Sequence, residues 1–160
     1  MAVKIVGAKI TPEFQLRSLI AKFGPKEQRL IRAVRSALRK RLPSVNELVY
    51  DYGTSIVIGY SPTENGIESM VSIAARPDGV RLHLMRGPQL PDPKKLLMGT
   101  GKQTRYIRLE AATQLARPDV AALIAAAIAQ ASVPRRSKGS GALVIKSTEA
   151  MKRSRRKRSK

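Results

Sequence analysis

The chain has 160 residues, of which 31 are lysine or arginine and 11 are aspartate or glutamate, so its formal net charge is +20. It contains no cysteine, which excludes disulfides, thiolate metal sites and thiol catalysis. Hydrophobic residues make up 42% of the sequence, enough for one globular core and too much for a wholly disordered chain. Because no apolar run approaches the length of a signal peptide or a membrane span, we expect a soluble, cytoplasmic protein.

Two helices are predicted near the start of the chain. Thr11-Pro12-Glu13 is a typical helix start: the threonine caps, the proline suits the first helical position and the glutamate complements the helix dipole. An apolar stripe then runs to Phe23, and Gly24-Pro25 ends the element. A second helix is expected from about Lys26 to Arg41, before Pro43.

The second helix is divided into an apolar face and a basic arc. At 100° per residue, its aliphatic side chains share one face. The opposite arc holds Arg29, Arg32, Arg35, Arg39 and Lys40. This arc has two interpretations, namely the solvated face of a packed helix or a stripe of phosphate-contacting cations.

From Glu47 the hydrophobic pattern alternates with a period of two, which indicates strands. Four strands are expected up to Met85 and a fifth over Thr104–Leu109, with short connections that imply antiparallel neighbours. Pro118 begins a last helix that ends near Ala131. We therefore predict an α+β domain with a mostly antiparallel five-stranded sheet, packed by two N-terminal helices and one C-terminal helix.

The segment around Gly99 and Gly101 is the best candidate for an anion-binding loop. It is not a nucleotide-binding P-loop, because Leu96 replaces the first glycine of that motif and Gln103 replaces the serine or threonine after the lysine. The two glycines still permit close backbone approach. The candidate anion- or ligand-binding residues are Gly99, Gly101, Lys102, Arg105, Arg108, Tyr50 and Tyr52.

No constellation of residues predicts catalysis, a metal centre or a cofactor. His83 is the single histidine, and it has no Cys or Ser partner with a local signature for nucleophilic catalysis. The acidic residues are dispersed, and among them Asp51 would share a face with Val49, where burial would require a cationic partner. We therefore expect no bound metal, no cofactor and no enzymatic activity.

Basic residues are densest at the C-terminus. Residues 134–160 hold 11 basic residues and one acidic residue, whereas residues 1–133 hold 20 and 10, so each part carries +10. The last ten residues are almost entirely Lys, Arg and Ser, which predicts a disordered basic tail over residues 148–160. Such a tail favours polyanions. Its candidate contacts are Lys152, Arg153, Arg155, Arg156, Lys157 and Arg158.

Five stretches resemble the YdhG-like family of small bacterial proteins, a domain of unknown function. They are LIRAVRSALRKRLPSVNELVYDYG (30–53), VIGYSPTE (57–64), VSIAARPDGVRLHLMRGPQLPDP (71–93), LLMGTGKQTRYIRLE (96–110) and ARPDVAALIAAAIAQA (116–131). The resemblance implies a compact α+β domain with an antiparallel sheet. It also implies that Leu143–Lys146 belongs to the domain, which we place at residues 11–147.

Two functions are compatible with these features. The first is a binding or accessory domain that associates electrostatically with nucleic acid or ribonucleoprotein through its tail and through Arg32, Arg35 and Arg39. The alternative is a protein that binds a small anionic ligand, or a metal chaperone, since some YdhG-like proteins resemble frataxin-type iron chaperones. Frataxin-type iron binding uses an acidic surface, whereas this chain is basic.

Overall fold

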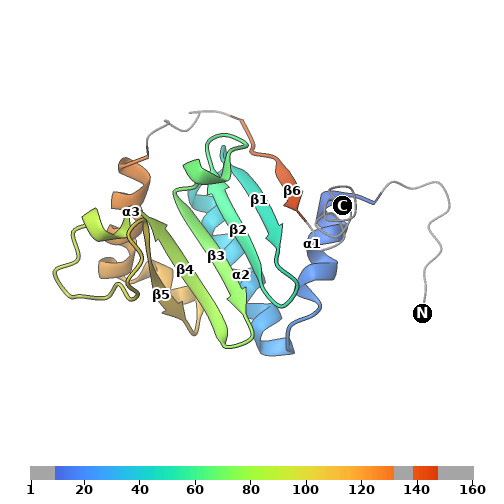
Figure 1. Ribbon diagram of the computed structural model, residues 1–160, viewed down its shortest axis with the longest axis horizontal. Coiled ribbons are helices and arrows are strands. Elements are labelled where there is room, and N and C mark those ends of the chain that lie inside the picture. The colour runs from blue at the N-terminus through green and yellow to red at the C-terminus, as the bar shows by residue number, and fades with distance from the viewer. Residues whose placement is uncertain (1–9, 132–138, 148–160) are drawn as a thin grey trace, which may run out of the picture.

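The computed structural model describes residues 10–131 and 139–147 of the chain. Figure 1 shows its helices and strands in order. The principal elements are α1 (Pro12–Ile20), α2 (Pro25–Arg41), β1 (Asn46–Asp51), β2 (Ile56–Ser61), β3 (Val71–Arg76), β4 (Gly79–Met85), β5 (Thr104–Leu109), α3 (Pro118–Ala129) and β6 (Leu143–Ser147). Three short 3-10 helices lie between them: η1 (Gly66–Glu68), η2 (Gly87–Gln89) and η3 (Ala112–Ala116).

The strands form one mixed sheet in the order β5-β4-β3-β2-β1-β6. Neighbours from β5 to β1 are antiparallel, as the short connections predict. The α+β class is confirmed and five strands are antiparallel neighbours, but the predicted strand count is not exact, because β6 adds a sixth strand that pairs in parallel with β1. A parallel neighbour is reached only through a long connection, and here that connection contains the rest of the sheet and α3.

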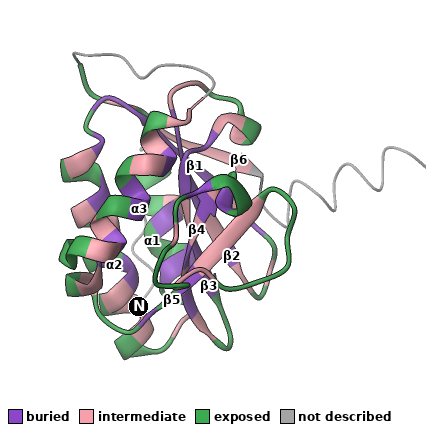
Figure 2. Ribbon diagram, turned by 90° about the vertical axis from the view of Figure 1, so that its left-hand side faces the viewer, coloured by how far each residue is buried: buried purple, intermediate pink, exposed green. Residues whose placement is uncertain are grey.

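The main helices cover one face of the sheet, as Figures 1 and 2 show. The aliphatic face of α2 is buried at Ile31, Val34 and Leu38, none of which is exposed to solvent. Helix α3 contributes a second apolar face. Alternate residues of the strands, such as Ile58 and Leu82, meet these helices and complete the core.

The predicted start of α1 has the expected chemistry, whereas Pro25, which the sequence assigns to the end of that helix, begins α2. Thr11 caps α1 by accepting a hydrogen bond from the Phe14 backbone amide at 3.1 Å. Proline occupies a first-turn position in α1, α2 and α3.

Asp51 is buried on the face that it shares with Val49, and its carboxylate accepts from the Gly53 amide and lies 3.9 Å from the Lys22 ammonium.

The opposite face of the sheet carries a cluster of aromatic and cationic side chains. His83 and Tyr106 are cross-strand partners with ring centroids 5.4 Å apart, and the guanidinium of Arg81 lies 4.3 Å from the Tyr106 ring centroid. Burial, together with the charge of Arg81, lowers the pKa of His83.

Among the described residues, no helix has both the length and the apolar character needed to cross a bilayer.

Candidate functional site

A groove of about 470 Å³ lies between the C-terminal half of α2, the start of β1 and the segment that leads into β6. The α2 side of the groove contributes cations: Arg32, Arg35, Arg39 and Lys40. Glu47 and Tyr60 lie among its other lining residues. The structure therefore brings together Arg32, Arg35 and Arg39, the three helical residues that the sequence nominates for polyanion binding.

Arg35 is held by two carboxylates. It donates through Nε and Nη2 to the two carboxylate oxygens of Glu47, at 2.9 and 3.0 Å. It also donates through Nη1 and Nη2 to Glu13, at 3.2 and 2.7 Å. Tyr60 donates its hydroxyl hydrogen to Glu47 Oε2 at 2.8 Å. We call Arg35, Glu47, Glu13 and Tyr60 the Arg35 network.

The Arg35 network changes the ionisation of its members. The hydrogen bond from Arg35 holds the pKa of Glu13 below its usual value. Burial by itself would lower the pKa of Arg35, but its hydrogen bonds with Glu47 and Glu13 raise that pKa instead. Burial, reinforced by the charge of Glu47, raises the pKa of Tyr60 well above its usual value. Arg35 is therefore a structural cation within the groove.

The raised pKa of Tyr60 predicts a loss of stability at high pH. The unfolded chain releases the tyrosine proton near pH 10, whereas the folded chain keeps it, so the free energy of unfolding falls as the pH rises above 10. The expected slope is about 1.4 kcal/mol per pH unit for this group. Urea denaturation at several pH values should show that Tyr60→Phe lacks this contribution. An equal alkaline loss in the variant would contradict the assignment.

The other cations of the basic arc face solvent. Arg29, Arg32 and Lys40 are exposed, and none of them pairs with a carboxylate in the described structure. Arg39 is 56% exposed and makes only longer ion pairs, at 3.6 Å to Glu47 and 3.8 Å to Glu13. The solvent-facing rim of the groove is therefore cationic, while its acidic residues are engaged by Arg35.

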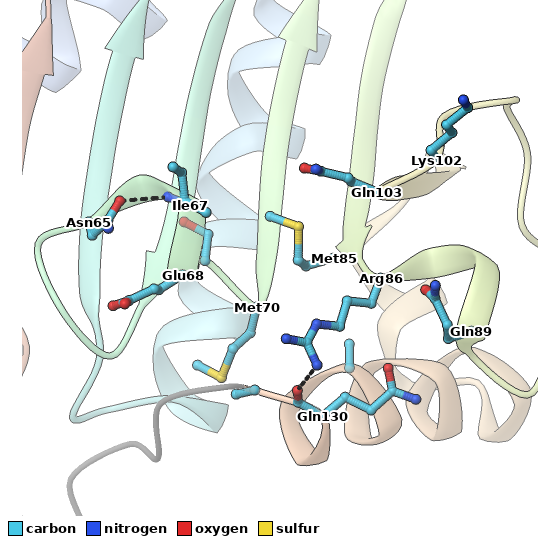
Figure 3. Close-up of a pocket in the computed structure, with 13 residues that line it drawn as sticks. Asn65, Ile67, Glu68, Met70, Met85, Arg86, Gln89, Lys102, Gln103 and Gln130 are labelled. Carbon is cyan, nitrogen blue, oxygen red and sulfur yellow. Dashed lines mark hydrogen bonds between the residues drawn. The ribbon is translucent and has the colours of Figure 1, made fainter.

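A second cavity, of about 540 Å³, lies at one end of the sheet beside the C-terminal end of α3 (Figure 3). Its apolar lining includes Met70, Met85 and Ile67. Its polar lining is rich in carboxamides and also contains two cations and one carboxylate. These polar residues are Asn65, Glu68, Ser69, Arg86, Gln89, Lys102, Gln103 and Gln130.

Of the loop residues nominated from the sequence, Lys102 alone lines this cavity. Arg105 instead donates through Nε to the Gly101 carbonyl at 2.8 Å. Arg108 lies 3.4 Å from the Asp78 carboxylate. Gly99 has a φ of +99°, and a Cβ there would lie 3.0 Å from the Tyr106 ring, so its lack of a side chain serves the turn. Lys102 thus lines the cavity, whereas Arg105 and Arg108 make local contacts and do not reach it.

Tyr50 and Tyr52 do not join that loop. Their rings stack on each other with centroids 6.5 Å apart. Tyr50 lies on β1 and Arg108 on β5, with three strands between them. Four strand spacings of roughly 4.8 Å correspond to about 19 Å. The glycine loop and the two tyrosines therefore do not form a single ligand site.

Sequence reasoning missed the residues that each site draws from distant segments. Glu47 and Tyr60 lie in segments whose alternating pattern predicts strands, and nothing in that local pattern indicates that they meet Arg35. Arg86 has no sequence signal for its left-handed backbone. The predicted tail over residues 148–160, with Lys152, Arg153, Arg155, Arg156, Lys157 and Arg158, lies outside the described residues.

Within residues 10–131 and 139–147, no three His, Asp or Glu side chains gather in a way that could hold a metal ion. No family model matches the chain, and no curated protein or solved structure is significantly similar to it. The resemblance to the YdhG-like family therefore stays a prediction.

Proposed function

We propose that this protein binds the phosphate backbone of nucleic acid, free or within a ribonucleoprotein, through the basic arc of α2 and its C-terminal tail. One observation carries the proposal. The groove beside α2 exposes Arg32, Arg39 and Lys40, while the carboxylates nearest to them are already engaged by Arg35. The cations at the rim are therefore available to an external anion.

Helix geometry supports contact with an extended polyanion better than contact with a single ion. Arg32 and Arg39 are seven residues apart, which corresponds to about 10 Å along a helix axis. A ligand that neutralises both must therefore carry several anionic groups along its length. A nucleic acid backbone has this character, and displacing its counterions supplies a favourable, salt-dependent contribution to binding.

The basic residues at the C-terminal end of α2 also have a structural role, which must be distinguished from binding. Arg39, Lys40 and Arg41 lie in the last turn of α2, where cations complement the helix dipole. That interaction contributes to stability and needs no partner. Binding must therefore be attributed by position on the surface, and not by total charge.

A pair of charge reversals matched to a control pair makes this test. Arg32→Glu/Lys40→Glu changes the groove. Arg76→Glu/Lys95→Glu changes the net charge equally, and Arg76 lies at the opposite end of the sheet, where β3 turns into β4. Fluorescence anisotropy with short DNA and RNA duplexes should show about tenfold or more weaker binding for the groove pair. The control pair should weaken binding much less.

Equal weakening by the two pairs would show that binding follows net charge alone and would contradict a role for the groove. Deletion of residues 151–160 separates the contribution of the tail. We expect the shortened chain to bind more weakly than the full chain and to remain sensitive to the groove reversals. Arg35 is excluded from the reversals, because changing it would disturb the Arg35 network.

A further inference from the structure

The cavity beside α3 contains a cation held in an unusual backbone conformation. Arg86 has φ 56° and ψ 33°, the left-handed region that non-glycine residues seldom occupy. Its Nη1 donates to the Gln130 carbonyl at the end of α3, at 3.2 Å. Figure 3 shows its guanidinium between the two methionines and Gln130. Strained residues of this kind concentrate at ligand sites.

The single carboxylate of the cavity does not neutralise Arg86. Glu68 accepts a short hydrogen bond from the Thr63 hydroxyl, and in Figure 3 its carboxylate points away from Arg86. Lys102 lies at the rim, with its ammonium group also turned outward. Arg86 is itself exposed, so the mouth of the cavity carries two cations, Arg86 and Lys102.

A buried acceptor in the same cavity lacks a donor. Gln130 Oε1 is buried and accepts no hydrogen bond from any described residue. Buried polar atoms are nearly always paired with protein, water or ligand, so a rotation of the half-buried Gln130 side chain that brings this oxygen to the cavity would let a ligand supply the donor. Gln89 and Gln103 add two more carboxamides to the lining.

The apolar part of the cavity suits a planar body. Met85 is half-buried and supplies the accessible thioether of the cavity, while Met70 packs in the core beside it and is 2% exposed. Thioethers pack favourably against aromatic rings. Carboxamides form paired hydrogen bonds with the edge of a purine, as they do with adenine in nucleic acids. The volume of about 540 Å³ lies within the range of small-molecule sites.

We propose that this cavity binds a small organic phosphate with a planar heteroaromatic body, of the size of a purine mononucleotide. Arg86 contacts the phosphate, with Lys102 closing from the rim. Met85 contacts the ring with Met70 packed behind it, and Gln130 Oε1 accepts from a ring amino group after its side chain turns toward the ligand. This site is separate from the α2 groove and does not depend on nucleic acid binding.

The test uses adenosine 5′-monophosphate on the full chain labelled with 13C at the methionine methyl groups. The chain has five methionines, and Met98 is 45% exposed and outside the cavity lining, so it serves as an internal control. The nucleotide should shift the Met70 and Met85 signals and leave Met98 unchanged. Adenosine and ribose 5-phosphate should each bind at least about tenfold more weakly.

Variants separate binding from folding. Arg86→Asn should weaken binding by about tenfold or more. Asn tolerates a left-handed backbone, so the melting temperature should change little. Arg32→Glu/Lys40→Glu should leave nucleotide binding unchanged, which distinguishes this site from the groove. The proposal is overturned if the nucleotide shifts no methionine signal at millimolar concentration. It is also overturned if Met98 shifts equally, or if adenosine or ribose 5-phosphate binds as well.

Discussion

Replacing Arg35 with methionine should lower the free energy of unfolding by about 3–5 kcal/mol, the usual cost of removing one member of a buried ion pair. The side chains of Arg35 and Glu47 are 14% and 6% exposed, so water entering from the groove can replace the guanidinium only in part. The variant leaves the Glu47 carboxylate buried with only Tyr60 and the longer Arg39 contact. Urea denaturation at neutral pH measures the difference.

Two further variants make the cause specific. Arg32→Met removes an exposed cation one turn earlier and should change stability by no more than about 0.5 kcal/mol. Adding Glu47→Gln to Arg35→Met removes the buried charge while keeping an acceptor for Tyr60, so it should restore part of the loss. If Arg35→Met costs no more than Arg32→Met, the Arg35 network does not hold the helix to the sheet.

Replacing Gly141 with alanine should detach β6 from the sheet. A Cβ at this position would overlap the Val45 carbonyl oxygen and lie 2.9 Å from the Asn46 amide nitrogen, both of which are backbone atoms. The Gly141 amide also donates to the Pro43 carbonyl at 2.9 Å, so the segment cannot move away without losing this bond. We expect the free energy of unfolding to fall by about 3 kcal/mol or more.

Amide hydrogen exchange locates the effect of this substitution. The amides of β6 should lose protection, while those of β3 and β4 in the middle of the sheet should keep theirs. Ser140→Ala changes the exposed neighbour and should leave the protection of β6 as it is in the parent chain. Unchanged protection of β6 in Gly141→Ala would contradict the close approach of this segment to β1.

The local elements of the fold could be predicted because their signals are local. Helix α2 has a regular apolar stripe and a proline at its start, and its predicted bounds differ from the observed ones by one residue. Strand β5 begins at Thr104 and ends at Leu109, as predicted. Strand alternation predicts that Asp51 shares a face with Val49, and both residues are buried.

The sites could not be predicted, because they depend on contacts between distant segments. Arg35 looks like its neighbours on the basic arc, and only the packing of α2 over β1 brings Glu47 to it. The parallel pairing of β6 with β1 joins residues almost one hundred positions apart, and no alternation pattern specifies such a partner. The sequence also gives no sign that the backbone of Arg86 is left-handed, because arginine seldom adopts that conformation.

The salt dependence of binding tests the central claim most directly. For the full chain and a short DNA duplex, the logarithm of the association constant should fall linearly with the logarithm of the salt concentration. Reversing Arg32 and Lys40 should reduce the magnitude of this slope by about 1–2 units, since each cation that leaves a phosphate removes about one. The Arg76→Glu/Lys95→Glu control should keep the original slope. An unchanged slope in the groove variant would contradict the assignment of α2 as the nucleic acid interface.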